Sequence, residues 1–172
     1  MLSRAALRGI LSHYLGSGAS ELSFVVGPHG KPALGGDAAG RVHFNLSHSG
    51  GVALVGVSSD REVGVDVERI RADLDEMALA RLALGVEAVT RLEASEPERR
   101  TVEFFRFWVR HEAAIKCRGV ALGKGKQGGE DGLLVEDAAV GAGYAAAFAV
   151  AVGVEGVERW DPALVGCWAW DG

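Results

Sequence analysis

Three consecutive stretches between residues 41 and 68 have the hydrophobic patterns of β-strands, and they constrain the fold more than any other part of the chain. Residues 41–48 alternate between apolar and polar side chains, which is typical of a strand with one face in the core. Residues 52–58 and 62–68 are two apolar runs separated by Ser59-Asp60-Arg61, a spacing that predicts a β-hairpin. The centre of the chain is therefore predicted to be β-structure.

Helical patterns lie on both sides of these strands, so the predicted fold class is α+β. The predicted helices span residues 2–15, residues 73–93, and a segment that opens at a capping box, Ser95-Glu96-Pro97-Glu98, and ends near Cys117. The remaining predicted strands span residues 22–26, residues 144–154 and residues 165–170, with a turn at Asp161-Pro162 before the last of them. The same order, a helix followed by strands, occurs twice along the chain.

Composition argues against several classes of protein. The 172 residues are 48% hydrophobic, which is enough for a core, and the net charge is −5 without the basic stripe of a nucleic-acid binder. The longest uncharged run, residues 138–154, is short for a membrane span, and the N-terminus lacks a secretory core. Cys117 and Cys167 have no metal-ligand spacing and are interpreted as free thiols. We expect a cytoplasmic protein with no nucleic-acid or membrane partner.

A pair of carboxylates forms the first candidate site, in Gly64-Val65-Asp66-Val67-Glu68. Residues two apart on a strand face the same side, so Asp66 and Glu68 project together, about 7 Å apart. Two like charges this close favour a compensating cation, and oxygen ligands suit Mg²⁺. The alternative is an exposed edge strand whose carboxylates are simply solvated.

The predicted long helix carries the second candidate site. Trp108, Glu112 and Lys116 occur at positions i, i+4 and i+8, so they share one face. Glu112 could provide a third carboxylate for the same ion, and Lys116 a cation for phosphate oxygens. The alternative is an ordinary Glu–Lys pair beside a core tryptophan.

Two further segments carry groups that suit a phosphate. In Phe44-Asn45-Leu46-Ser47-His48-Ser49-Gly50, the side chains of Ser47 and His48 could donate hydrogen bonds at a strand end. Gly30-Lys31-Pro32 holds a lysine on a rigid turn. Taken alone, the serine and histidine are also compatible with an unremarkable turn.

These four motifs occur together, in an order that resembles the Sfp-type 4'-phosphopantetheinyl transferases, and the resemblance runs from about residue 4 to residue 152. It implies a pseudo-twofold fold of two similar α+β halves, an abbreviated first half (1–58) and a second half (59–172) with the metal site. Coenzyme A would bind in the shared cleft. The implied metal ligands are Asp66, Glu68 and Glu112, the implied coenzyme A contacts are Lys31, Ser47 and His48, and the implied catalytic residues are Glu112 and Lys116.

The implied reaction is the Mg²⁺-dependent transfer of the phosphopantetheine arm of coenzyme A to a serine of an acyl or peptidyl carrier protein. It would release 3',5'-ADP and serve fatty-acid, polyketide or nonribosomal peptide synthesis. One alternative is a truncated relative that binds coenzyme A or a carrier protein without transfer. Another is an unrelated α+β domain, which requires Asp66, Glu68 and Glu112 to lie far apart.

Two features depart from the family. His111 stands where the family usually has a lysine, which predicts a pH-dependent contribution to phosphate binding. Family members also usually begin well upstream of residue 1, so the chain is expected to be short at its N-terminus. A shortened first half would leave a sheet edge exposed, and we expect either a monomer or a homodimer that covers it.

Overall fold

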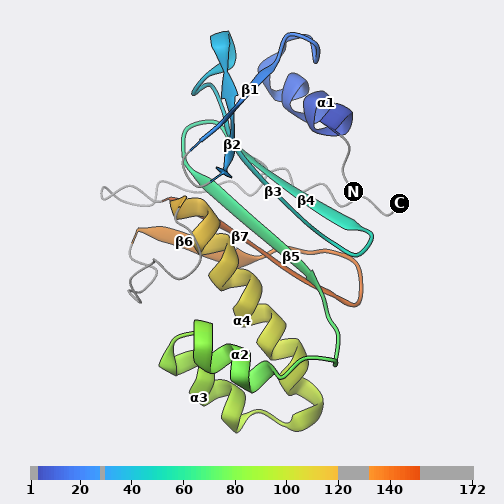
Figure 1. Cartoon of the computed structure of the whole chain (residues 1–172), viewed down its shortest axis with the longest axis vertical. Coiled ribbons are helices and arrows are strands. Elements are labelled where there is room, and N and C mark those ends of the chain that lie inside the picture. Colours follow the sequence, from blue (N-terminus) through green and yellow to red (C-terminus); the bar gives the residue numbers. More distant parts are fainter. Residues whose placement is uncertain (1–3, 28–29, 120–131, 152–172) are drawn as a thin grey trace.

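The computed structural model describes residues 4–27, 30–119 and 132–151, and it confirms the α+β class (Figure 1). The elements are α1 (Arg4–Leu15), β1 (Ser23–Val26), β2 (Pro32–Gly35), the short 3-10 helix η2 (Gly36–Ala38), β3 (His43–Ser49), β4 (Val52–Ser58), β5 (Val63–Arg69), α2 (Glu76–Ala83), α3 (Val86–Ala94), α4 (Pro97–Arg118), β6 (Leu133–Asp137) and β7 (Tyr144–Ala151). The predicted strand at 165–170, the turn before it and Cys167 lie outside the described residues.

The first group of elements packs α1 against β1, β2 and the β3–β4 pair (Figure 1). Leu11 and Leu15 from α1 meet Phe44 from β3 and Val55 and Val57 from β4 in one buried cluster. The apolar spacing of the first predicted helix and the apolar face of residues 41–48 are both confirmed by this core.

The predicted hairpin between residues 52–58 and 62–68 is wrong. β4 pairs with β3 instead, with Asn45 opposite Gly56, and β5 pairs antiparallel with β7. A tight turn at Gly50 makes the β3–β4 hairpin possible, because its φ of 57° is a conformation that glycine adopts without strain. The residues between β4 and β5 therefore connect strands of different sheets.

The second sheet has the strand order β5-β7-β6, and α4 lies across one of its faces (Figure 1). β7 turns small residues, Ala145, Ala147 and Ala149, toward this helix. β5 contributes Gly64, where an added Cβ would lie only 2.1 Å from the backbone oxygen of Ala113. Small side chains thus let α4 approach the sheet closely, and this approach sets the position of every side chain on its inner face.

Side chains of β3 cover the free edge of β5. Residue by residue along the two strands, the N–H of Val65 donates to Asn45 Oδ1 (2.9 Å), that of Val67 to Ser47 Oγ (3.4 Å) and that of Arg69 to Ser49 Oγ (3.0 Å). The polar face of β3 is consequently buried, with Asn45 only 6% and Ser47 9% exposed. The sequence predicted a half-buried strand with one face in the core, and the structure covers the second face as well, because its side chains serve as hydrogen-bond partners for a neighbouring backbone.

The helices between residues 73 and 118 differ from the prediction in two ways. Residues 73–93 form two short helices, α2 and α3, separated at Leu84 and Gly85. The predicted capping box is also wrong: Glu96 is the N-cap of α4 without a side-chain cap bond, and the Ser95 hydroxyl instead bonds to the Arg91 carbonyl and to Glu103.

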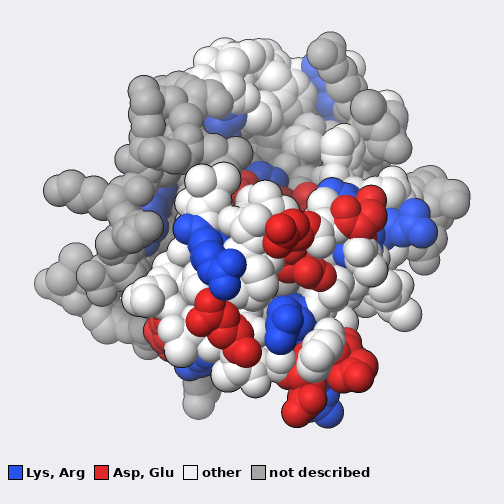
Figure 2. Space-filling view, turned by 60° about the horizontal axis from the view of Figure 1, so that its bottom comes forward, with Lys and Arg blue, Asp and Glu red and all other residues white. Residues whose placement is uncertain are grey.

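The end of the molecule formed by α2 and α3 has a mixed surface charge (Figure 2). On these helices Arg81 pairs with Glu93 at 2.9 Å, and Arg91 pairs with Glu87 at 2.8 Å. Within the described part of the chain, no helix combines the length and apolar character that crossing a membrane requires.

Candidate active site

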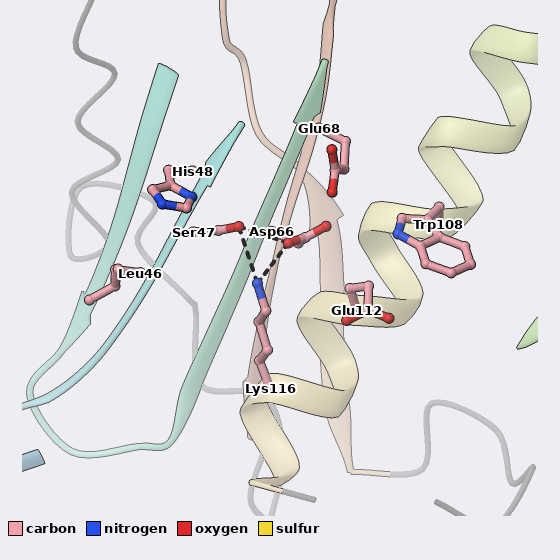
Figure 3. Close-up of a pocket in the computed structure, with 8 residues that line it drawn as sticks. All are labelled: Leu46, Ser47, His48, Asp66, Glu68, Trp108, Glu112 and Lys116. Atoms are coloured by element: carbon pink, nitrogen blue, oxygen red, sulfur yellow. Dashed lines mark hydrogen bonds and ion pairs between the residues drawn. The ribbon is translucent and has the colours of Figure 1, made fainter. Parts of the chain in front are cut away.

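A cavity of about 360 Å³ lies between β3, β5 and α4. Figure 3 shows that the side chains around it come from these three elements. Its lining residues are Leu46, Ser47, His48, Asp66, Glu68, Trp108, Glu112 and Lys116. All of the predicted site residues except Lys31 therefore meet in one place. The alternative of an unrelated domain, which needed the three carboxylates far apart, is excluded.

Asp66 and Lys116 form the centre of the cavity (Figure 3). Lys116 Nζ lies 2.7 Å from Asp66 Oδ1 and 3.1 Å from Ser47 Oγ, and Ser47 Oγ donates to the same Asp66 oxygen at 2.8 Å. Asp66 is only 4% exposed, whereas the Lys116 side chain is 30% exposed. The lysine thus pairs across the site with β5, and the simple intrahelical Glu–Lys pair is not the arrangement adopted.

Two carboxylate oxygens in this cavity are buried without a partner. Among the described residues, Asp66 Oδ2 and Glu112 Oε1 accept no hydrogen bond. Burial raises the pKa of Glu112 above its ordinary value of 4.5, and the charge of Asp66 raises it further; Lys116 opposes this shift, and Glu68 adds to it. Unsatisfied buried oxygens of like charge are costly, so the site is suited to an additional cation or to a proton.

The three acidic side chains are chemically suited to a magnesium ion, because their carboxylates provide oxygen ligands. Two of them, Asp66 and Glu112, have an oxygen without a hydrogen-bond partner among the described residues. In this conformation, however, no group of three acidic, histidine or cysteine side chains in the described residues is arranged as a metal site. The Lys116 ammonium bonds to Asp66 and supplies positive charge there. The metal role predicted for Asp66, Glu68 and Glu112 stays a prediction.

The two predicted phosphate contacts on β3 differ in their accessibility. His48 is exposed at the cavity, so its imidazole is available to a ligand. Ser47 is buried, and its hydroxyl already bonds to Asp66, Lys116 and the Val67 N–H. In this arrangement Ser47 orients Asp66, and a phosphate contact by its hydroxyl stays a prediction.

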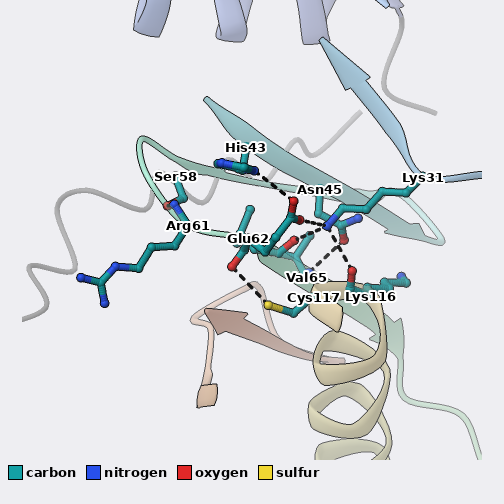
Figure 4. A network of polar contacts seen from close by, with 10 residues as sticks. Lys31, His43, Asn45, Ser58, Arg61, Glu62, Val65, Lys116 and Cys117 are labelled. Carbon is teal, nitrogen blue, oxygen red and sulfur yellow. Dashed lines mark hydrogen bonds and ion pairs between the residues drawn. The ribbon is translucent and has the colours of Figure 1, made fainter. Parts of the chain in front are cut away.

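Lys31 lies outside the cavity, in a polar network at the end of α4 (Figure 4). Its ammonium pairs with Glu62 Oε2 at 2.6 Å and donates to the carbonyls of Val63 (3.1 Å) and Lys116 (3.2 Å). His43 Nδ1 lies 3.1 Å from the other Glu62 oxygen. This network joins the turn before β2 to the second sheet, and the predicted contact of Lys31 with the nucleotide remains untested.

We expect Lys31→Met to lower the free energy of unfolding by about 1–2 kcal/mol, because the Val63 carbonyl loses its ammonium donor and the Lys116 carbonyl keeps only the N–H of Gly119, at 3.3 Å. Most of the loss should come from these carbonyls, since Glu62 is half-exposed and an exposed ion pair contributes little. Urea denaturation measures the change. The matched control is Arg61→Met, which removes only the exposed pair with Asp60. Equal effects of the two substitutions would contradict the assignment.

Two other residues singled out in the sequence lie on α4, outside the cavity lining. Burial, with a contribution from Arg118, lowers the pKa of His111 below 6.5. This shift favours the neutral imidazole, and the pH-dependent contribution of His111 to phosphate binding stays a prediction. Burial raises the pKa of the Cys117 thiol to about 11, so this cysteine is a buried, unreactive thiol, in line with the prediction.

One polar residue next to the site, Ser49, was not predicted from the sequence. Its hydroxyl donates to Glu68 Oε2 at 2.8 Å while it accepts the N–H of Arg69. The signal was present in the sequence, because Asn45, Ser47 and Ser49 repeat at the period of a strand. What could not be seen was that this face meets β5.

With this geometry in view, comparison with known proteins shows which superfamily the chain is similar to. Residues 62–146 match the sequence model of the 4'-phosphopantetheinyl transferase superfamily. The matched segment contains β5, α4 and β7 up to Ala146, and thus all three acidic residues and Lys116. Residues 62–146 are thus similar to the 4'-phosphopantetheinyl transferase superfamily.

Curated relatives agree with this assignment. The Synechocystis protein slr0495 is 36% identical over 126 residues, 73% of this chain and 50% of its own length. HetI of Nostoc is 35% identical over 70% of this chain and 52% of its own length, and AcpT of Salmonella typhi is 40% identical over 55% and 48%. The chain spans about half the length of these relatives. They are of AcpT and HetI type, so they do not single out the Sfp-type group.

Proposed function

We propose that this chain transfers the 4'-phosphopantetheine group of coenzyme A to a serine of an acyl or peptidyl carrier protein. The observation that carries the proposal is the cavity beside Lys116, where Asp66 and Glu112 each keep a buried oxygen that has no partner in the described part of the chain. All three residues lie in the segment that matches the superfamily. Relatives of both AcpT and HetI type bear the name of this activity. An Sfp-type specificity for the carrier is part of the proposal.

Asp66, Glu68 and Glu112 are the residues that would hold Mg²⁺. The ion, when bound, would offset the negative charge of the coenzyme A pyrophosphate. The fit rests on this chain's own side chains: two buried oxygens lack partners among the described residues, and burial together with the acidic neighbours raises the pKa of Glu112. A divalent cation would remove this like-charge repulsion.

The chemistry proposed for the protein groups is a phosphoryl transfer. The carrier serine oxygen forms a bond to the β-phosphorus of coenzyme A, the bond from that phosphorus to the leaving oxygen breaks, and 3',5'-ADP departs. Glu112 accepts the serine proton, a role that suits a carboxylate whose pKa is raised. Lys116 stabilises the negative charge on the phosphate oxygens, since its ammonium already lies in the cavity.

The remaining parts of the proposal concern binding and arrangement. Coenzyme A would lie in a cleft between two related halves, residues 1–58 and 59–172, with the exposed His48 contacting a phosphate and with further contacts from Ser47 and Lys31. The proposed location is cytoplasmic. Sedimentation velocity distinguishes the two solution states, a monomer or a homodimer.

A transfer assay tests the function directly. The protein is incubated with coenzyme A, an apo carrier protein and Mg²⁺, and mass spectrometry follows the carrier. We expect the carrier mass to rise by one phosphopantetheinyl group, and we expect chelation by EDTA or replacement of the acceptor serine by alanine to abolish the change. If calorimetry shows coenzyme A binding but the carrier is never modified, the non-catalytic relative is the correct account.

A further inference from the structure

One bonding pattern occurs twice between β3 and β5. Ser47 accepts the N–H of Val67 and donates to Asp66, and Ser49 accepts the N–H of Arg69 and donates to Glu68. In both cases the serine accepts from the residue after the carboxylate and donates to the carboxylate itself. The second serine lies outside the matched superfamily segment and outside the residues discussed under the proposed function.

This pattern fixes the direction of the Ser49 hydroxyl proton. A serine hydroxyl has one hydrogen to donate. With the Arg69 N–H pointing at the oxygen at 3.0 Å, the hydrogen is directed to Glu68 Oε2 at 2.8 Å. One oxygen of Glu68 is thereby held on the β3 side of the strand. The same carboxylate lines the cavity, so its second oxygen is the one available to a ligand there.

The position of Ser49 is itself fixed from the other side. It is the last residue of β3, and the turn that follows is held by the N–H of Gly51, which donates to the Tyr144 hydroxyl at 3.2 Å. Tyr144 lies opposite Arg69 in the β5–β7 ladder. The Ser49 hydroxyl thus bonds to β5, and the turn that follows it is held to β7. This arrangement allows Ser49 to orient a half-buried glutamate whose side chain would otherwise rotate.

We propose that Ser49 is a positioning residue: it orients the Glu68 carboxylate so that one oxygen faces the cavity for a divalent cation. This inference rests on the proposed function, because it assumes that the cavity binds Mg²⁺. It adds a residue that acts through Glu68 and does not itself contact the ion or the substrate. Asp66 is oriented by Ser47 in the same way, but Lys116 contacts the same oxygen of Asp66, so Ser49 offers the cleaner test.

The experiment compares three variants of the full chain by calorimetric titration of MgCl₂ in the presence of coenzyme A. Ser49→Ala removes the hydroxyl, and Ser49→Thr keeps it on a residue that strands tolerate. Ser58→Ala is the matched control, because the Ser58 hydroxyl also accepts a backbone N–H, that of Arg61, at 3.3 Å, but lies at the other end of the β3–β4 hairpin and outside the cavity lining. Thermal unfolding of each variant measures the loss of stability separately.

We expect Ser49→Ala to raise the Kd for Mg²⁺ by about tenfold or more, with Ser49→Thr and Ser58→Ala both within about threefold of wild type. Each alanine variant removes the side-chain acceptor of one backbone N–H, and Ser49→Ala also removes the hydrogen bond to Glu68, so its loss of stability should be at least that of Ser58→Ala. If Ser49→Ala does not fold, Ser49→Cys takes its place, since a thiol is a much weaker donor.

Two results would overturn the inference: a wild-type protein that binds no Mg²⁺, or a Ser49→Ala protein with wild-type Mg²⁺ affinity. Failure of the proposed function has a different signature. A protein that binds Mg²⁺, responds to Ser49→Ala as expected and yet leaves the carrier unmodified would retain the positioning role and lose the transferase role.

Discussion

Gly64→Ala should destabilise the protein by at least about 3 kcal/mol, the upper end for overpacking, because the added methyl group has no space. Its Cβ would lie 2.1 Å from the Ala113 oxygen, 2.3 Å from the Cys117 nitrogen and 2.9 Å from the Cys117 Cα. All three are backbone atoms of α4, so no side-chain rotation relieves the contact. The helix must move away from β5, and Glu112 must move with it. Urea denaturation measures the loss of stability.

The matched control is Gly9→Ala in α1. Gly9 is exposed, and an added Cβ meets nothing within 4 Å. Because alanine loses less backbone entropy than glycine in a helix, this change should stabilise the protein by about 0.5–1 kcal/mol. The same chemical substitution therefore has opposite signs at the two positions. A Gly64→Ala protein with wild-type stability would show that α4 does not lie this close to β5.

Glu112→Gln should reduce transfer to the carrier protein by about 100-fold or more, which is the scale of a general base, while leaving stability equal to or greater than that of wild type. The two effects separate because the ionised Glu112 is costly to the fold. Its pKa is raised by burial and by Asp66, and Oε1 has no partner among the described residues. Glutamine keeps the shape and removes the charge. Transfer kinetics and urea denaturation measure the two effects.

The raised pKa of Glu112 determines how the stability effect of Glu112→Gln changes with pH. The folded pKa of Glu112 lies above its ordinary 4.5, so the folded protein binds more protons than the unfolded chain between these two values. Stability contributed by this group therefore falls as pH rises through that window. The advantage of Glu112→Gln should be present near neutral pH and vanish toward pH 4.5. Glu98→Gln, an exposed substitution on the same helix, should alter neither activity nor the pH profile. A large loss of stability in Glu112→Gln would contradict the assignment.

Much of the candidate site could be predicted from local spacing. Asp66 and Glu68 project from one strand because they are two residues apart, and Trp108, Glu112 and Lys116 share a helix face because they are four apart. The structure places all five side chains around one cavity. These predictions needed only the knowledge of whether each segment is a helix or a strand, and the hydrophobic pattern indicates this well.

The predictions that failed depended on which surfaces meet. Short spacing suggested a hairpin between β4 and β5, but β5 pairs with β7, far along the chain. A serine before a proline suggested a capping box, but the Ser95 hydroxyl bonds to Arg91 and Glu103. In each case the local pattern was compatible with two partners, and the tertiary packing favours the partner that lies farther along the chain.

The sequence by itself determined the α+β class, the strands and helices that carry the site, and the residue types available there. Only the tertiary structure decided which groups became partners. In the folded protein the polar face of β3 bonds to the open edge of β5, Lys116 pairs with Asp66 rather than with Glu112, and Lys31 lies at the end of α4. The physical reason is that buried polar groups must find partners, and the candidates come from segments that the sequence keeps far apart.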